Sequence, residues 1–387
     1  MTLLDPRYLV LVAVSWLAFF SVPPRFRPHV LTGSGLVFYT LYAPIAGCLA
    51  AALVVFTHLL TREPGRRSTA IAVVICVGLL AYYKWPRGFV IAGADLADVR
   101  SGGPLVPLGL SFLALELIHY AVERRRGRIR SGTLLDLAAF AFFFPCRMAG
   151  PIKRFNDFTA SVLSAERSSD NISEGCLRIV GGILKKVALA DVLGRKAATI
   201  ALAATPLEAW TVMVAYSLQL YLDFSAYSDI AIGVSRLMGI RVPENFRWPY
   251  ASPNIQDFWN RWHMSLSWWA REYVFMVFGR ALFKRRWNAT VIACVCYLAT
   301  FLVVGAWHGL TASFLVWGAY HGLLTASFHF YKTVLPVRIA ASPIYQSRAA
   351  AWGGAAVTFV LVTIGWVFFR MDLPGAIRVL SLMLSWR

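Results

Sequence analysis

Two histidine-containing segments lie in or beside apolar runs of membrane length. Residues 258–267 hold His263 among tryptophans, and residues 305–309 hold His308 directly after Trp307. An ionisable side chain inside a bilayer is costly, so it is read as functional by default. Histidine titrates close to neutrality, and a buried imidazole can therefore take or give a proton at working pH. Together the segments predict proton-transfer chemistry within a membrane.

Each histidine also has a structural interpretation. His308 could be a core residue that donates to a neighbouring carbonyl, and His263 could be solvated at the membrane interface. His321 follows His308 by 13 residues, or about 220° on a single helix, so the two would not share a face and we expect His321 to be structural. The other histidines are near span ends or isolated, and we interpret them as background: His29, His58, His119 and His329.

Composition sets the class of protein. Hydrophobic residues make up 58% of the 387 residues and charged residues 15%, with a mean hydropathy of +0.60, whereas soluble domains average about 45–50% and about 25%. We therefore predict an all-α polytopic membrane protein of one domain, with about ten or eleven spans of roughly 20 residues. The candidate runs are 8–22, 31–60, 69–84, 104–121, 132–149, 176–203, 207–239, 288–306, 308–331 and 349–370.

Several of these segments need separate comment. Residues 8–22 lack the flanks of a cleaved signal peptide and are expected to remain as a span. The runs 31–60 and 207–239 are too long for one straight span, so each is tilted or broken, with Pro44 a candidate break. Residues 253–272 mix charged and aromatic side chains, which predicts an interfacial or re-entrant helix that lines a cavity.

The net charge of +19, from 38 basic and 19 acidic residues, is distributed over short loops between apolar runs. This pattern indicates positive-inside topology and contact with anionic lipids rather than nucleic acid. The clusters at 62–67 and 124–130 are two spans apart and are predicted to be cytoplasmic. The loop 85–103, with Asp95 and Asp98, would face outward.

Several other chemistries find no support in the sequence. The six cysteines show neither zinc-site spacing nor a disulfide framework, and no nucleophile elbow, P-loop or His-Glu-x-x-His motif is present. We therefore predict neither a metal nor a bound cofactor. Asp223 and Asp229 could form a proton relay in a transporter, or could cap a broken helix and bond to Ser, Tyr or Arg236.

A set of ordered blocks resembles the membrane-bound O-acyltransferase family. The blocks are 107–112, 143–145, 149–152, 219–239, 242–246, 258–273, 307–309 and 364–370, so the resemblance covers roughly residues 100 to 375. The predicted organisation is a single domain, 1–387, with N-terminal spans in 1–100 and the family core in 101–375.

The resemblance implies a helical bundle around a central funnel and acyl transfer from a thioester to a hydroxyl. His308 matches the family's catalytic histidine and His263 its second histidine, while His321 matches a recurring position without a settled role. Residues in the same blocks are expected to bind or orient substrate: Asn260, Trp262, Ser267 and Trp307.

Two bacterial branches of the family compete. Residues 259–267 and 271–276 are very similar to the D-alanyl transfer proteins of teichoic-acid D-alanylation. The alginate-type O-acetyltransferases usually have a Pro-Leu-Gly-Gly block where this chain has 277–280, although 365–370 look more acetyltransferase-like. The sequence therefore favours D-alanyl transfer, with exopolysaccharide O-acetylation as the alternative.

The resemblance also implies partners in a bacterial plasma membrane. The donor would be a phosphopantetheine thioester on an acidic acyl carrier protein, docked at 124–130 or 284–286 unless these clusters only set topology. The acceptor would be an envelope polymer or a lipid-linked intermediate, and other subunits of an acylation complex are expected. A transporter or flippase for an envelope substrate is the rival from another class, and a silent scaffold is a third possibility.

Overall fold

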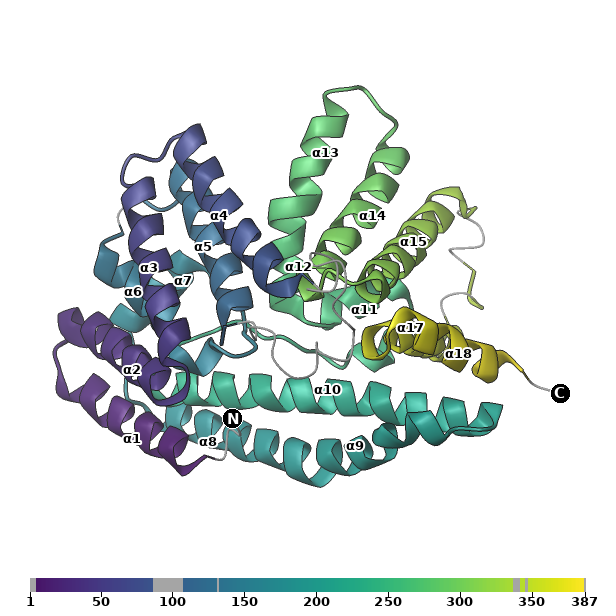
Figure 1. The fold of residues 1–387 in the computed structure, drawn as a ribbon, viewed down its shortest axis with the longest axis horizontal. Helices are drawn as coiled ribbons and strands as arrows, with labels where there is room; N and C mark the ends of the chain where they lie inside the picture. The colour runs from purple at the N-terminus through teal and green to yellow at the C-terminus, as the bar shows by residue number, and fades with distance from the viewer. Residues whose placement is uncertain (1–4, 86–106, 131, 337–341, 345–346, 386–387) are drawn as a thin grey trace, which may run out of the picture. The chain divides into compact units, whose positions relative to one another are not determined.

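The computed structural model describes residues 5–85, 107–130, 132–336, 342–344 and 347–385, and within these ranges it is helical without a β-strand. The loop predicted to face outward, with Asp95 and Asp98, lies outside the described residues. Short 3₁₀ and π segments join some of the α-helices, whose bounds are α1 Pro6–Ser21, α2 Arg27–Tyr42, α3 Pro44–Thr61, α4 Arg66–Lys84, α5 Leu110–Arg125, α6 Leu134–Phe142, α7 Phe155–Leu163, α8 Ser169–Leu184, α9 Asp191–Ala197, α10 Pro206–Leu237, α11 Ile255–Arg261, α12 Met264–Ala270, α13 Met276–Phe283, α14 Ala289–His308, α15 Ala312–Val334, α17 Arg348–Arg370 and α18 Leu373–Leu384 (Figure 1).

The all-α class predicted from composition is confirmed. Among the described residues, the helices long and apolar enough to cross a membrane are α3, α4, α14 and α17, judged by length and composition. On α4, the side chains of Ile71, Val74 and Val77 are exposed, as expected for a helix surface that faces lipid rather than water. The predicted total of about ten or eleven spans stays a prediction.

Three of the candidate runs differ in whether and where the helix ends. The run 31–60 does break at Pro44, which begins α3 directly after the end of α2, because proline suits the first turn of a helix and lacks an N–H for its interior. The run 207–239 instead forms one unbroken helix of 32 residues, α10. The run 132–149 is wrong as a helical span, because α6 ends at Phe142 and a 3₁₀ turn with Pro145 follows.

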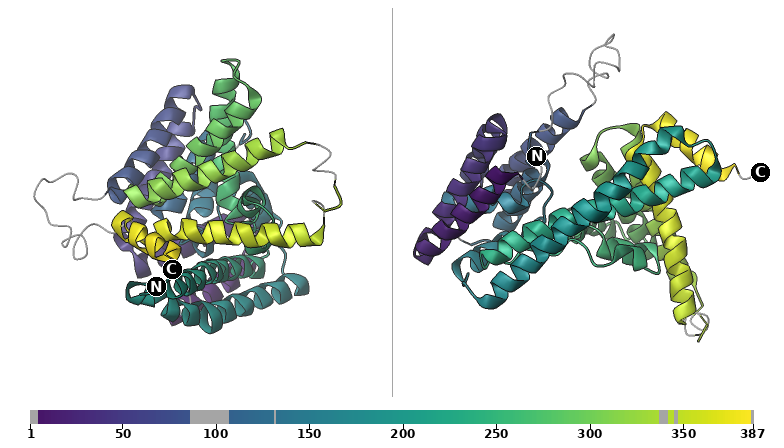
Figure 2. Two further views of the ribbon diagram at one scale, coloured as in Figure 1. Left: turned by 90° about the vertical axis from the view of Figure 1, so that its right-hand side faces the viewer. Right: turned by 90° about the horizontal axis from the view of Figure 1, so that it is seen from below.

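The chain divides into two compact units, which are described separately. The first unit comprises residues 1–186 and 224–244, and the second comprises 187–223 and 245–387, so α10 contributes to both. In the first unit, α8 lies alongside the C-terminal half of α10 (Figures 1 and 2). The contact is close at Gly175 and Gly233, where a Cβ on either residue would lie within 3 Å of the other's carbonyl oxygen.

In the second unit, small residues bring α14 and α15 together. A Cβ on Gly305 would lie 2.4 Å from the carbonyl oxygen of Phe314, and one on Gly318 would lie 2.5 Å from that of Phe301. Glycines at such helix crossings let two backbones approach closely. Helices α11 and α17 also pack against α15, and Figure 2 shows α15 and α17 side by side. This packing places His308, the last residue of α14, against α15.

Candidate active site

The polar, aromatic segment 253–272 forms two short helices rather than a span, which fits the predicted interfacial or re-entrant segment. Helix α11 begins after Asn254, whose side chain accepts a hydrogen bond from the backbone N–H of Asp257 at 2.9 Å. The chain turns at His263, whose φ of 42° lies in the left-handed region. A non-glycine residue rarely adopts this conformation, and such strain concentrates at functional sites. His263 therefore marks a turn that its surroundings must hold.

Asn245 holds this turn from outside the segment. Its backbone carbonyl accepts from the N–H of Met264 at 2.9 Å, and its side-chain carbonyl accepts from the hydroxyl of Ser265 at 2.6 Å. Asn245 is fully buried, so both hydrogen bonds are shielded from water. Asn245 lies in the family-like block 242–246, but the sequence did not predict this role. A hydrogen bond between side chains 20 residues apart leaves no local pattern in the sequence.

A pocket of about 250 Å³ opens beside α12 and α14 in the second unit. Two residues predicted to bind or orient substrate, Asn260 and Ser267, line it. Asn260 is exposed and accepts a hydrogen bond from Arg271 at 3.1 Å. Arg271 lines the pocket as well, and the other lining side chains are both apolar and polar, namely Gln256, Trp259, Leu266, Ala270, Phe275, Met276, Tyr297, Thr300, Phe301, Val304 and Thr325.

His308 is half-buried at the C-terminal end of α14. Its ring centroid lies 4.8 Å from that of Trp307, 5.3 Å from Trp317 and 4.9 Å from Phe369. Aromatic rings on several sides fix the plane of the imidazole, while partial exposure leaves it within reach of a substrate. Trp307 is also half-buried and contacts His308 without lining the pocket, and its predicted contact with substrate stays a prediction.

His263 and Trp262 are buried and do not line the pocket among the described residues. Burial lowers the pKa of His263 to about 3, so its imidazole is neutral at pH 7. Trp262 packs in a cluster of rings, 5.0 Å from Trp366 and 5.2 Å from Phe246. Both positions support the α11–α12 turn, and the predicted substrate contact of Trp262 stays a prediction.

His321 occupies a different position from the one expected on a single helix. Because α14 ends at His308 and α15 begins at Ala312, the rotation argument does not apply, and Trp317 contacts both imidazoles, at 5.3 Å from His308 and 5.0 Å from His321. His321 is fully buried and lies 5.1 Å from Trp259 of the pocket wall. The sequence signal that could have found this was the repeat of a His-Gly pair on neighbouring apolar runs.

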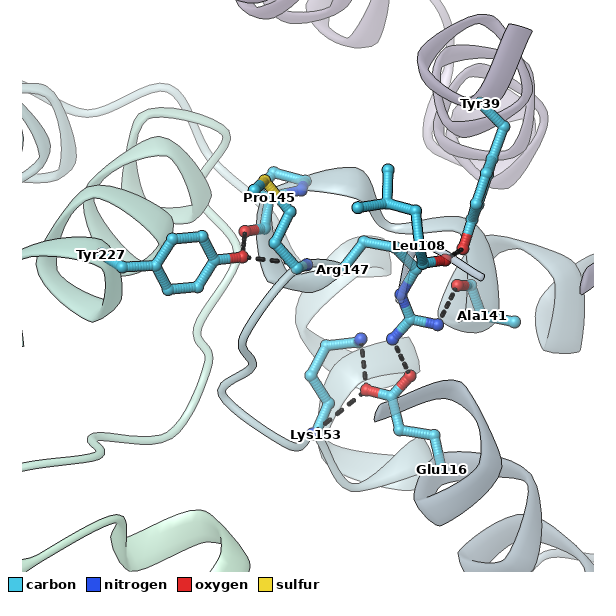
Figure 3. Close-up of polar contacts among 9 residues, drawn as sticks. Tyr39, Leu108, Glu116, Ala141, Pro145, Arg147, Lys153 and Tyr227 are labelled. Carbon is cyan, nitrogen blue, oxygen red and sulfur yellow. Dashed lines mark hydrogen bonds and ion pairs between the residues drawn. The ribbon is translucent and has the colours of Figure 1, made fainter. Parts of the chain in front are cut away.

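A second buried polar cluster, in the first unit, was not predicted. The carboxylate of Glu116 accepts from Arg147 at 2.5 Å and from the ammonium of Lys153 at 2.6 Å, and all three side chains are at most 1% exposed (Figure 3). Tyr227 donates to the carbonyl of Pro145 at 2.9 Å and accepts from the N–H of Met148 at 3.1 Å. These contacts hold the segment 145–153, which includes a family-like block, against α5 and α10.

Asp229, a candidate relay residue, forms ion pairs. Its carboxylate accepts from Arg178 at 2.8 Å and from Lys185 at 2.5 Å, and Arg178 also pairs with Glu244 at 2.6 Å. These ion pairs join Asp229 on α10 to α8 and to the segment that follows α8. This geometry favours the structural interpretation of Asp229, although its bonding partners are not the ones expected.

The two basic clusters differ in how they are engaged. In the 124–130 cluster, Arg124 donates to backbone carbonyls of residues 61, 129 and 130, and Arg126 and Arg128 pair with Glu123. The 284–286 cluster lies exposed at the tip between α13 and α14, beside the exposed rings of Phe283 and Trp287. Exposed cations are thus present in both clusters, Arg125 and Arg130 among them, and 284–286 is the cluster in which every side chain is exposed.

Within the described ranges, no group of three or more His, Cys, Asp or Glu side chains could hold a metal ion. The six cysteines are free thiols. The polar groups of the site described above are imidazoles, indoles, amides, hydroxyls and the guanidinium of Arg271, which suit proton transfer and hydrogen bonding.

Comparison with known proteins shows which family the chain resembles over most of its length. Residues 11–370 match the model of the membrane-bound O-acyltransferase family. A probable alginate O-acetylase of Pseudomonas syringae pv. tomato is 35% identical over 80% of this chain and 59% of its own length. A probable alginate O-acetylase of Azotobacter vinelandii is 33% identical over 95% of this chain and 74% of its own length. The teichoic acid D-alanyltransferase of Bacillus subtilis is 34% identical over 67% of this chain and 73% of its own length. The chain therefore spans less than two thirds of the first of these relatives.

Proposed function

The chain belongs to the membrane-bound O-acyltransferase family, and from that premise we propose that it transfers an acyl group from a thioester donor to a hydroxyl of a cell-envelope polymer or its carrier intermediate. The observation that carries the proposal is the half-buried His308 at the end of α14. It is the one family-like histidine that the structure leaves accessible, since His263 and His321 are buried.

In the proposed reaction, His308 removes the proton from the acceptor hydroxyl as its oxygen attacks the thioester carbonyl carbon. The ester C–O bond forms, the C–S bond breaks, and the leaving thiolate takes up the proton that His308 had removed, which returns His308 to its neutral form. A positioned general base contributes about 10²–10⁴-fold to rate. Asn260 and Ser267, which line the pocket, are the candidates to orient a substrate there. No resident cofactor is needed for this chemistry.

Two donors fit the proposal. The acetyl donor has the broader support, because the probable alginate O-acetylases match up to 95% of this chain. A D-alanyl donor on a phosphopantetheine carrier protein, which the sequence favoured, is supported by the 34% identity to the Bacillus subtilis D-alanyltransferase over 67% of the chain. The first experiment therefore has to distinguish an acetyl donor from a D-alanyl donor.

For a carrier-borne donor, we place docking at 284–286 rather than at 124–130. The side chains at 284–286 are all exposed, whereas in the other cluster Arg124 donates to the carbonyl of Thr61 and Arg126 and Arg128 pair with Glu123. Reversing the charges at 284–286 should weaken binding of an acidic carrier and flatten its salt dependence, because salt screens exposed charge pairs. Unchanged affinity would leave these residues a topological role only.

The test of the function offers D-alanyl carrier protein and an acetyl thioester in parallel to purified membranes and measures hydroxylamine-labile ester on the acceptor. We expect label from one donor to fall at least 100-fold in His308→Ala and to persist in the control His29→Ala, which changes an exposed histidine. Equal transfer by wild type and His308→Ala at equal protein levels would refute the catalytic role. Absence of label from both donors would refute the proposed reaction and make transport the next activity to assay.

A further inference from the structure

Three aromatic side chains separate the pocket from His308 and carry polar atoms without partners. Trp259 lines the pocket, Trp317 contacts His308 at 5.3 Å, and His321 lies between them, 5.1 Å from Trp259 and 5.0 Å from Trp317. Among the described residues, the indole nitrogens of both tryptophans and both imidazole nitrogens of His321 are buried without a hydrogen-bond partner.

Such a concentration of unpaired nitrogens is unusual. Buried polar groups in native proteins are overwhelmingly hydrogen-bonded, and exceptions call for a specific explanation. His321 is 0% exposed and Trp317 is 1% exposed, so bulk water does not satisfy them. Packing alone does not require the nitrogens of His321, because a phenyl ring could fill the space of the imidazole. The cluster therefore has the character of a site that a ligand completes.

The chemistry of the atoms indicates what that ligand carries. An indole nitrogen only donates, while a neutral imidazole has one donor and one acceptor nitrogen. The cluster thus offers three N–H donors and one acceptor, which matches a hydroxyl that accepts through its oxygen and donates its proton. The hydroxyl of Thr300 on the pocket wall is also buried without a partner in the described part of the chain, which extends the same chemistry toward the pocket.

From these observations we propose that His321 is a positioning residue which, with the indole N–H groups of Trp259 and Trp317, binds a hydroxyl of a polyhydroxylated acceptor. This inference rests on the proposed function and specifies its acceptor. The bound hydroxyl is a neighbour of the one that reacts. Holding it beside Trp317 presents the reacting hydroxyl to His308, because Trp317 contacts both imidazoles.

The test compares His321→Phe with His321→Gln in the full-length membrane enzyme. Phenylalanine fills the space of the imidazole without its nitrogens, whereas glutamine supplies a donor and an acceptor. For whichever thioester the wild type uses, we expect His321→Phe to raise the KM for the polyol acceptor at least tenfold and leave the KM for the donor unchanged. His321→Gln should recover part of the loss, and the melting temperature of His321→Phe should equal or exceed that of wild type.

Three results would overturn the inference. Wild-type kinetics in His321→Phe would show that the nitrogens bind no substrate, and a raised donor KM would assign the cluster to the donor instead. A fall in melting temperature that His321→Gln restores together with activity would show a purely structural role. Failure of the proposed function is a separate outcome, because it requires that the wild-type enzyme itself transfers no acyl group.

Discussion

Replacing Glu116 with glutamine removes the only negative charge from the buried cluster of Figure 3. In the native protein its carboxylate lies 2.5 Å from a nitrogen of Arg147 and 2.6 Å from that of Lys153, with all three side chains at most 1% exposed. Glutamine would leave two cations in an apolar surrounding without a counter-charge. Removing one partner of a buried ion pair typically costs about 3–5 kcal/mol, a large part of the ~5–15 kcal/mol that stabilises a folded protein.

The control is Glu244→Gln, which breaks an ion pair of similar length, 2.6 Å to Arg178, between side chains that are 44% and 33% exposed. Exposed pairs contribute about 0–1 kcal/mol, so this variant should unfold almost as wild type does. Equilibrium unfolding in mixed micelles, followed by tryptophan fluorescence, measures both. A loss below about 1 kcal/mol for Glu116→Gln, equal to that of the control, would refute the reasoning. Glu116→Gln combined with Lys153→Met should recover part of the lost stability, because only one unpaired buried cation then remains.

Two further predictions concern the candidate active site. Gly365→Ala should reduce the rate of acyl transfer at least tenfold, because the added Cβ would clash with the Nε2 atom of His321. The control is Gly353→Ala on the same helix, whose Cβ would meet nothing within 4 Å and which should keep the wild-type rate. Equal rates in the two variants would contradict the importance of His321. Asn245→Ala should destabilise the protein by about 1–3 kcal/mol, because it leaves the buried hydroxyl of Ser265 without the acceptor seen at 2.6 Å, and unchanged unfolding would show that the turn at His263 needs no such clamp.

Local patterns in the sequence predicted the features that depend on local chemistry. Composition predicted the helical membrane class, Pro44 predicted the break between α2 and α3, and the mixture of charges and tryptophans predicted that 253–272 would not form a span. The run 132–149 failed as a span because apolar content does not reveal where a helix ends. Phe143 and Pro145 continue the apolar run while α6 already stops at Phe142.

The contacts of the buried Glu116 cluster in the first unit were beyond reach of the sequence because they join distant residues. Glu116 meets Arg147 and Lys153 across separations of 31 and 37 residues, and a single carboxylate in an apolar run carries no sign of its partners.

The sequence alone also gives no basis for assigning different roles to the three histidines of the family-like blocks. His263, His308 and His321 are similar in sequence, since each lies beside aromatic residues. The structure gives them different environments: His263 is buried at a left-handed turn, His308 is half-buried at a helix end, and His321 is fully buried. A general base must reach its substrate, which favours His308. A residue that binds a substrate group gains from exclusion of water, because hydrogen bonds strengthen in a low-dielectric surrounding, which favours His321. In our proposal, exposure therefore assigns the role of base to His308, and burial beside Trp259 of the pocket wall assigns the binding role to His321.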